Sequence, residues 1–262
     1  MRIALSIAAS DPTGGAGLQA DLQVFRSLGV HGAGVVSALT VQDTAKVHSV
    51  LPVFPSVVLD QLRTLLADVV PHAVKIGALV SDDVVRNVLL ALGGLGEGVP
   101  IVIDPILFSS SGAPLLERRA WASLSALIDR CALVTPNLPE AEALTGRDVS
   151  TRAGTEQAAR SFLCDLGARA VLVKGGHREG ALADLLATRD EDAGVSFTWL
   201  EGERIDRGTV HGTGCALSSA VAAGLARGDS LEAAVARARR FVATAIASAD
   251  AAGSGARLLV YP

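Results

Sequence analysis

The sequence of 262 residues has few aromatic residues and no excess of basic ones. Aromatic residues make up 3% of the chain, and the formal net charge is -4. A site for single-stranded nucleic acid usually combines stacking aromatic residues with a basic groove. No run of five or six basic residues is present that could follow a phosphate backbone. The composition therefore argues against a nucleic-acid partner and favours a small ligand.

The sequence also lacks a long apolar run. None reaches the ~18 residues that a membrane-spanning helix needs, so no membrane partner is expected. Residues 3–9 are apolar but too short and too weakly flanked for a signal peptide, and we interpret them as a buried strand. Three cysteines, Cys131, Cys164 and Cys215, show no framework spacing, which favours free thiols in the cytoplasm. Cys131 and Cys164 are expected to behave as small hydrophobic residues.

Two common signatures of nucleotide and metal sites are missing. There is no Walker A motif, so nucleotide chemistry would need another phosphate-binding loop. The five histidines form no i,i+4 pair and no cluster with cysteine, so a structural zinc site is not supported. A loose dinucleotide fingerprint, Gly15-Ala-Gly-Leu-Gln-Ala20, is present, with Asp43 further along than the usual ~20 residues. A nicotinamide-dependent oxidoreductase is thus the alternative from a different class.

Apolar residues are plentiful, and they alternate in a regular way. Half of the residues are apolar and 19% are charged, which suits a single α/β domain over residues 1–262. Short apolar runs alternate with helical patterns, which predicts a mostly parallel sheet with helices on both faces. The predicted strands are residues 3–9, 33–41, 73–79, 101–106, 131–135 and 169–174. The predicted helices are residues 16–28, 56–69, 82–92, 117–128, 155–166, 215–226 and 231–249. Residues 181–188 and 195–200 predict a small hairpin at the sheet edge.

A glycine-rich turn, Ser10-Asp-Pro-Thr-Gly-Gly-Ala-Gly17, leads from the first predicted strand into the first predicted helix. The backbone donors of that helix N-terminus could bind a polar or anionic ligand, or the turn could be a simple connection. On the helix, Asp21 falls on the apolar stripe that contains Leu22 and Phe25. We therefore expect its carboxylate to face inward, where it either bonds within the protein or faces a ligand.

A second glycine-rich segment, His211-Gly-Thr-Gly-Cys215, precedes a helix of small residues. Gly212, Thr213 and Gly214 would let backbone N–H groups approach a phosphoryl group, and the helix dipole would stabilise its charge. The same dipole predicts a lowered pKa for the Cys215 thiol, which makes Cys215 a candidate proton acceptor. The alternative is a tight turn with an idle cysteine.

Side chains with oxygen atoms follow two neighbouring predicted strands. Asp104 lies at the end of the fourth strand, and Asn137 and Glu140 follow the fifth. Ligands of open α/β sheets bind beyond the carboxyl ends of the strands, and Mg²⁺ prefers oxygen ligands. The sequence predicts a Mg²⁺ site at Asp104, Asn137 and Glu140. Asn137 and Glu140 could instead cap the helix that begins between them.

Seven segments in order resemble the hydroxymethylpyrimidine and phosphomethylpyrimidine kinases of thiamine biosynthesis, within the ribokinase-like superfamily. They are Ser10-Asp-Pro-Thr-Gly-Gly-Ala-Gly-Leu-Gln-Ala-Asp21, Ala38-Leu-Thr-Val-Gln-Asp-Thr44, Lys75-Ile-Gly77, Asp104-Pro105, Thr135-Pro-Asn-Leu-Pro-Glu-Ala141, Val173-Lys-Gly-Gly-His177 and His211-Gly-Thr-Gly-Cys215. The resemblance implies a ribokinase-like three-layer sandwich, ATP and Mg²⁺ as cofactors, and a homodimer. It also implies phosphorylation of 4-amino-5-hydroxymethyl-2-methylpyrimidine and of its monophosphate. A pyridoxal-type kinase is the related alternative, and Gln42 favours the aminopyrimidine.

The resemblance also implies roles for individual residues. The pyrimidine would be bound by Asp21, Gln42 and Gly77. The ATP phosphates would lie near Lys174, Gly175 and Gly176, and Mg²⁺ with its waters near Asp104, Asn137 and Glu140. The anion hole would be formed by Gly212, Thr213, Gly214 and Cys215. The chain departs from the family pattern at Ala9, Ala78 and Ser110. Because Ser110 stands where a lysine is common, we expect the second phosphoryl transfer to be less efficient than the first.

Overall fold

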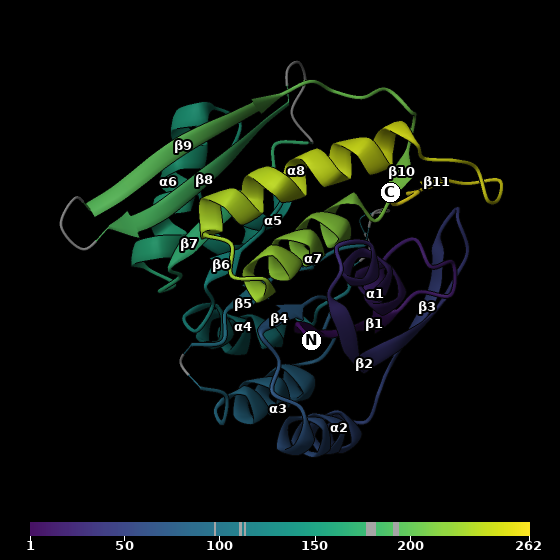
Figure 1. Ribbon diagram of the computed structural model, residues 1–262. Coiled ribbons are helices and arrows are strands. Elements are labelled where there is room, and N and C mark those ends of the chain that lie inside the picture. The colour runs from purple at the N-terminus through teal and green to yellow at the C-terminus, as the bar shows by residue number, and fades with distance from the viewer. Residues whose placement is uncertain (97, 110–111, 113, 177–181, 191–193) are drawn as a thin grey trace.

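The computed structural model describes residues 1–262 except 97, 110–111, 113, 177–181 and 191–193, and its described part is built on one large sheet (Figure 1). Its strands are β1 (Ile3–Ser10), β2 (His31–Gln42), β3 (Val47–Pro52), β4 (Ala73–Ile76), β5 (Ile101–Ile103), β6 (Leu133–Val134), β7 (Ala170–Val173), β8 (Leu182–Asp190) and β9 (Gly194–Gly202). The order across the described sheet is β3-β2-β1-β4-β5-β6-β7-β8-β9. Strands β2, β1, β4, β5, β6 and β7 pair in parallel, and β3, β8 and β9 are antiparallel to their neighbours. The predicted mostly parallel sheet is confirmed.

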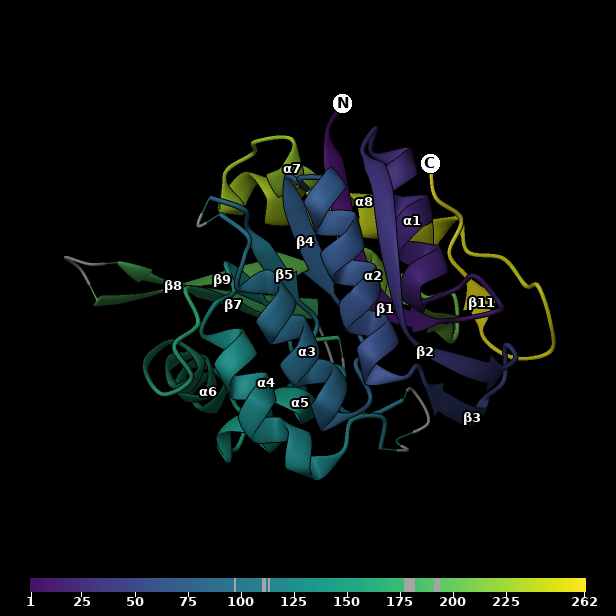
Figure 2. The ribbon, with the colours of Figure 1, turned by 90° about the horizontal axis from the view of Figure 1, so that it is seen from below.

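Helices cover both faces of this sheet and complete three layers (Figures 1 and 2). One face carries α1 (Gly17–Ser27), α7 (Thr213–Ala226) and α8 (Leu231–Ala247). The opposite face carries α2 (Pro55–Asp68), α3 (Asp82–Leu92), the 3-10 turn η1 (Arg118–Ala120), α4 (Trp121–Ile128), α5 (Leu138–Thr145) and α6 (Arg152–Cys164). Within the residues that the structure describes, no helix is long and apolar enough to cross a membrane.

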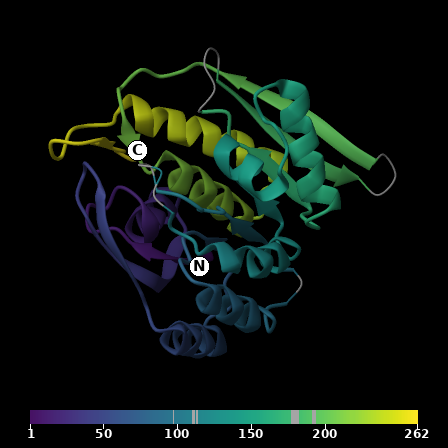
Figure 3. The same cartoon turned by 180° about the vertical axis from the view of Figure 1, so that it is seen from behind.

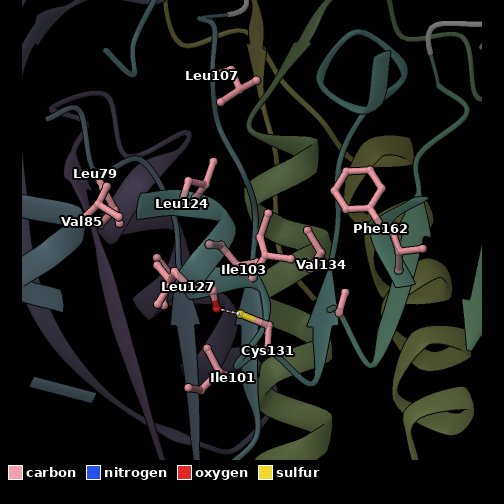
Figure 4. Close-up of a cluster of buried hydrophobic side chains, with 14 of the residues drawn as sticks. Leu79, Val85, Ile101, Ile103, Leu107, Leu124, Leu127, Cys131, Val134 and Phe162 are labelled. Carbon is pink, nitrogen blue, oxygen red and sulfur yellow. Dashed lines mark hydrogen bonds between the residues drawn. The ribbon is translucent and has the colours of Figure 1, made fainter. Parts of the chain in front are cut away.

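Each sheet face has its own apolar core, because successive strand residues point to opposite faces. In β4, Val74 and Ile76 belong to the core under α2 to α6, whereas Ala73 packs toward α1, α7 and α8. Figure 4 shows part of the first core, where the buried Cys131 donates its S–H to the Leu127 carbonyl at 3.1 Å. Burial raises the pKa of this thiol, so Cys131 is the inert hydrophobic residue that was predicted.

Several predicted details differ from the structure. Cys164 is exposed at the end of α6, so the expectation that it behaves as a small hydrophobic residue is wrong. The predicted edge hairpin is present as β8 and β9, and residues 181 and 191–193 lie outside the described part. Strand β4 ends at Ile76, earlier than predicted, because the chain then turns through Val80, which has a φ of 70°, to the α3 cap at Ser81. Strand β3 was not among the predicted elements, and helix α5 was expected only as the helix that Asn137 and Glu140 could cap.

The C-terminal segment returns to the carboxyl edge of the sheet. Strands β10 (Val210–His211) and β11 (Arg257–Leu258) form a small parallel pair. The Ala256 N–H donates to the Thr44 carbonyl at 2.8 Å, which ties the segment to the β2–β3 turn. Figure 3 shows the C-terminus beside this part of the molecule. The pairing places His211, and the start of α7 after it, next to the β2–β3 turn.

Candidate functional site

Two side chains of opposite charge meet where β5 and β7 end. Lys174 Nζ donates to Asp104 Oδ1 at 2.7 Å, and Thr135 Oγ1 donates to the same oxygen at 3.3 Å. The side chain of Lys174 is 15% exposed and that of Asp104 is 3% exposed. Burial alone would lower the pKa of Lys174, but the charges of Asp104 and Glu140 outweigh burial and raise it. A protonated ammonium group therefore lies at the carboxyl edge of the sheet.

The N-terminus of α7 faces this ion pair. A Cβ atom on Gly214 would lie 3.1 Å from Lys174 Nζ and 3.5 Å from Asp104 Oδ2. Gly212 has a φ of 80°, and a Cβ there would collide with the Gly15 carbonyl, so both its conformation and its packing require glycine. The first N–H groups of a helix lack partners within that helix and carry partial positive charge. The residues from Gly212 to Cys215 thus bring an anion-binding helix end against Lys174 and Asp104.

Cys215 lies in the first turn of α7 but does not have the predicted low pKa. Burial is the largest influence and raises the pKa of its thiol to about 11, although the charge of Lys75 opposes this rise. The negative charges of Asp21 and Asp104 raise it further. The prediction considered the helix dipole alone and is wrong because desolvation is the stronger effect. At neutral pH the group is almost entirely a thiol.

Asn137 and Glu140 form the capping box that the sequence left open as an alternative. Asn137 Oδ1 accepts from the Glu140 N–H at 2.8 Å, and the Asn137 N–H donates to Glu140 Oε2 at 2.8 Å. Asn137 also forms a parallel bridge with Lys174, so the cap adjoins the ion pair. Burial raises the pKa of Glu140 to about 7; Lys174 opposes this rise and Asp104 adds to it. In the described part of the chain, no group of three His, Cys, Asp or Glu side chains gathers as metal ligands. The Mg²⁺ site therefore stays a prediction.

Gln42 lies at the end of β2, beside the glycine-rich turn. Its Nε2 is 3.2 Å from His211 Nε2, which is also 2.9 Å from Asp11 Oδ2. Asp11 accepts from the backbone N–H groups of Thr13 and Ala16, each at 2.9 Å, and so holds the turn in shape. Burial would raise the pKa of Asp11, but the bonds from His211 and Thr13 outweigh it and the pKa is lowered. This arrangement joins β2, the glycine-rich turn and β10.

Gln42 and His211 also line a groove of about 480 Å³ between the β2–β3 turn, the segment before β10 and strand β11. His211, one of its lining residues, contacts Asp11 of the glycine-rich turn. Another hollow, of about 600 Å³, lies between β2 and α2 and is lined by none of the predicted site residues.

Asp21 faces inward, as its place on the apolar stripe predicts, and its side chain is fully buried. Lys75 Nζ donates to Oδ1 at 2.9 Å and to Oδ2 at 2.7 Å. Ser6 donates to Oδ2 and Ser219 donates to Oδ1, each at 2.6 Å. These contacts favour the alternative in which the carboxylate bonds within the protein. Its contact with the pyrimidine stays a prediction.

The predicted glycines occupy different surroundings. A Cβ on Gly77 would lie 2.8 Å from Lys75 Nζ, so this glycine lies directly against the buried lysine. Gly175 donates to Asp184 Oδ1 at 2.8 Å, and a Cβ there would collide with the Ala183 carbonyl. Gly176 is exposed, and no atom of the described residues lies within 4 Å of its Cβ position. Ser110 and His177 lie outside the described residues.

Sequence reasoning assigned no role to Lys75, Ser219 or Asp11. The signal for Lys75 was available, because a lysine inside an apolar, fully buried strand must have a partner. Asp11 stood in the glycine-rich turn that was singled out, and aspartate commonly bonds to backbone N–H groups two or more residues ahead. Ser219 is one of two adjacent serines in a small-residue helix, and nothing in the sequence distinguishes them.

Comparison with known proteins gives consistent matches over nearly the whole chain. Residues 11–259 match the family model described as phosphomethylpyrimidine kinase. A hydroxymethylpyrimidine/phosphomethylpyrimidine kinase of Staphylococcus aureus (strain MRSA252) is 37% identical over 257 residues, covering 97% of this chain and 91% of that protein. A thiamine biosynthesis bifunctional protein, ThiED, of Geobacter sulfurreducens is 40% identical over 253 residues, covering 96% of this chain and 50% of that protein.

Solved structures of two kinds are similar to this chain. The crystal structure of a phosphomethylpyrimidine kinase from Clostridium difficile has a TM-score of 0.81 and 32% identity, covering 94% of this chain and 100% of that chain. A pyridoxal kinase from Staphylococcus aureus in complex with AMP-PCP has a TM-score of 0.88 and 28% identity, covering 99% of this chain and 93% of that chain.

Proposed function

Since this chain belongs to the phosphomethylpyrimidine kinase family, we propose that it transfers the γ-phosphate of ATP to the hydroxymethyl group of 4-amino-5-hydroxymethyl-2-methylpyrimidine in thiamine biosynthesis. One observation carries the proposal: the first turn of α7, at Gly214, lies against the pair of Lys174 and Asp104. Phosphoryl transfer depends mainly on positioning and on stabilising charge. Helix N–H groups beside an ammonium group supply both.

The ATP phosphates are assigned to the end of β7. Lys174 is protonated and partly open to solvent, so its charge is available to a phosphate oxygen. Gly176 is exposed just after the end of β7, so its backbone is accessible to a phosphate. The AMP-PCP complex of the similar pyridoxal kinase supports ATP as the donor.

A magnesium ion is assigned to the edge formed by Asp104, Asn137 and Glu140. The chemistry of these donors fits, because Mg²⁺ typically takes one or two carboxylates and keeps several waters. The magnesium ion, when bound with ATP, would neutralise charge on the phosphates. Asp104 accepts a hydrogen bond from Lys174 and would also contact the magnesium ion. The capping box holds the Glu140 carboxylate in place.

The pyrimidine is assigned to the space beside Gln42 and Gly77, with Asp21 behind it. The Gln42 side chain borders the groove near His211, where its amide could pair with the amino group and a ring nitrogen of the substrate. The proposed reaction requires the hydroxymethyl group to point to the start of α7. The minor thiolate form of Cys215 would accept the hydroxyl proton late in the transfer and become the thiol, while the N–H groups from Gly212 to Cys215 stabilise the phosphoryl oxygens.

The monophosphate is proposed as a second substrate. The second phosphoryl transfer would be slower than the first, because Ser110 stands where a lysine is common.

We further propose that the protein acts in the cytoplasm as a homodimer. Exposed apolar side chains on β2, β3 and the start of α2 support a covered surface there; they include Leu39, Val41, Leu51 and Phe54. Light scattering coupled to gel filtration should give twice the chain mass, and Leu51→Lys should shift the mass toward that of one chain.

The experiment that tests the reaction is substrate-dependent ADP release. The protein is incubated with ATP and Mg²⁺ and, in separate reactions, with the hydroxymethylpyrimidine, its monophosphate, pyridoxal or no acceptor. The proposal predicts ADP release with the first two acceptors. No acceptor-dependent ADP would reject the kinase assignment, and a response to pyridoxal alone would assign the chain to the related activity.

A further inference from the structure

A cluster of four buried polar side chains joins four elements behind the candidate site. Ser6 of β1, Asp21 of α1, Lys75 of β4 and Ser219 of α7 are fully buried, and all meet at the Asp21 carboxylate. The pKa of Lys75 is raised, because the charges of Asp21 and Asp104 and the hydrogen bond to Asp21 outweigh the lowering by burial. The cluster is thus an ion pair whose carboxylate also accepts hydrogen bonds from two hydroxyl groups.

The cluster is connected to the candidate catalytic turn through helix geometry. Cys215 and Ser219 are four residues apart on α7, so their side chains lie on the same face, one turn apart. The bond from Ser219 Oγ to Asp21 therefore connects the face of α7 that carries Cys215 to α1. On the other side, Lys75 Nζ lies against Gly77, which follows β4 at the same edge.

The neighbouring serine behaves differently. Ser218 is also fully buried, but its hydroxyl donates to the carbonyls of Gly214 and Cys215, within its own helix. Ser218 and Ser219 therefore have the same size, are equally buried and lie on the same helix, but their hydroxyl groups donate to different acceptors. Ser219 links α7 to α1 and β4, and Ser218 does not.

We propose that Asp21, Lys75 and Ser219 form a positioning cluster that sets the rotation and depth of α7 and so places Cys215 and the adjacent N–H groups against the reacting phosphoryl group. The inference rests on the proposed kinase function for the identity of the reacting group. The geometric claim, that Ser219 holds the Cys215 turn in place, does not depend on it.

A buried ion pair by itself is weak support for such a role, because apolar residues of similar volume often stabilise a protein as well. The two serines provide the distinction. If the cluster serves stability alone, Ser219→Ala should change unfolding and leave the kinetics of the folded enzyme as they are. If it positions α7, kinetics should change in the folded enzyme.

The first experiment compares Ser219→Ala with Ser218→Ala in full kinetic measurements. Ser219→Ala should lower kcat by roughly ten- to a hundredfold, the scale of a misplaced reacting group, with KM for both substrates within about threefold of wild type. Ser218→Ala should keep kcat within about threefold. Thermal unfolding of both variants shows whether each is folded at the assay temperature.

The second experiment needs no kinase activity. Iodoacetamide is added to wild type and to both variants at fixed pH, and peptide mass spectrometry follows alkylation of Cys215 and of the exposed Cys164. Loosening α7 should expose the buried Cys215, so Ser219→Ala should alkylate it at least about threefold faster, with Cys164 unchanged as the internal reference.

The two readouts separate failure of this inference from failure of the proposed function. Unchanged kcat and unchanged Cys215 alkylation in Ser219→Ala would overturn the positioning cluster. Equal changes in Ser218→Ala and Ser219→Ala would also overturn it, because the bond to Asp21 would then not matter. If wild type showed no kinase activity, faster alkylation confined to Ser219→Ala would still support the cluster.

Discussion

Lys174 Nζ and Asp104 Oδ1 lie 2.7 Å apart, and this ion pair joins the ends of two strands separated by β6 in the sheet. The first turn of α7 faces the pair at Gly214. A cation, a carboxylate and a helix N-terminus therefore converge at one place, each with a separate task toward a phosphoryl group.

Replacing the cation Lys174 should weaken the binding of ATP more than the binding of the pyrimidine. Lys174→Met is expected to raise KM for ATP by about tenfold or more, since a charge-assisted bond to a phosphate oxygen is lost. Affinity for the pyrimidine, measured by calorimetry, should stay within about threefold. Arg152→Met is the control, because Arg152 pairs with Glu201 on the surface and should leave both constants unchanged. Equal loss of both ligands in Lys174→Met would contradict the assignment.

Removing the charge of Asp21 should mainly affect folding. Asp21→Asn leaves the ammonium group of Lys75 buried without its counter-charge, which should lower the free energy of unfolding by about 3–5 kcal/mol. Urea denaturation measures this loss. The surface change Glu201→Gln should cost less than about 1 kcal/mol. A fully stable Asp21→Asn protein that binds the pyrimidine about 1.5–3 kcal/mol more weakly would show instead that the carboxylate faces the substrate.

Substitutions in the first turn of α7 separate the N–H groups from the thiol. Gly214→Val should lower kcat at least as much as Cys215→Ala, because its side chain would press on Lys174 and Asp104. If the thiolate is the base, Cys215→Ala should cost ~10²–10⁴-fold, and Cys215→Asp should restore some turnover. Because the pKa of the thiol is about 11, wild-type kcat should rise with pH through the alkaline range. A pH profile that is the same in wild type and Cys215→Ala would remove Cys215 as the base, and a harmless Gly214→Val would remove the anion hole.

The raised pKa of Glu140 predicts how stability depends on pH. The pKa is about 7 in the folded state against an ordinary value of 4.5, so between these pH values the folded state binds more protons than the unfolded state. Stability is therefore lost as pH rises through this range. Glu140→Gln keeps a side chain that can form the capping box but does not ionise. Relative to wild type it should gain on the order of 3 kcal/mol between pH 4.5 and pH 8.

Urea denaturation at several pH values checks this difference. The exposed Glu142→Gln on the same helix is the control and should follow the wild-type pH dependence. If the free energies of unfolding of wild type and Glu140→Gln changed in parallel with pH, Glu140 would be ionised in the folded state over this whole range, which would contradict the prediction.

The sequence predicted much of the fold because buried parallel strands and their covering helices have strong patterns. It missed β3 because that edge strand leaves most of its residues exposed and so shows little alternation. It gave no range for α5, because the helix has only eight residues and a proline at its second position. The cap was nevertheless visible, since Asn137 and Glu140 have the capping-box spacing.

The sequence predicted the place of the site better than its electrostatics. The predicted element boundaries placed Asp104, Lys174 and the Gly212–Cys215 segment at the ends of strands and at the start of a helix. In the folded sheet these ends lie close together. The pKa of Cys215 could not be predicted, because burial depends on what the rest of the chain packs around α7. Likewise, the apolar stripe showed that Asp21 faces inward, but only the register of β1 and β4 brings Ser6 and Lys75 to it.

The most direct test of the central claim is a competition between two acceptors in one reaction. Equal concentrations of 4-amino-5-hydroxymethyl-2-methylpyrimidine and pyridoxal are mixed with the wild-type protein, limiting ATP and Mg²⁺, and the phosphorylated products are quantified by mass spectrometry. The account predicts that the pyrimidine monophosphate forms first and in excess, followed by the diphosphate. A product mixture dominated by pyridoxal phosphate, or ATP consumed without phosphorylation of either acceptor, would contradict it.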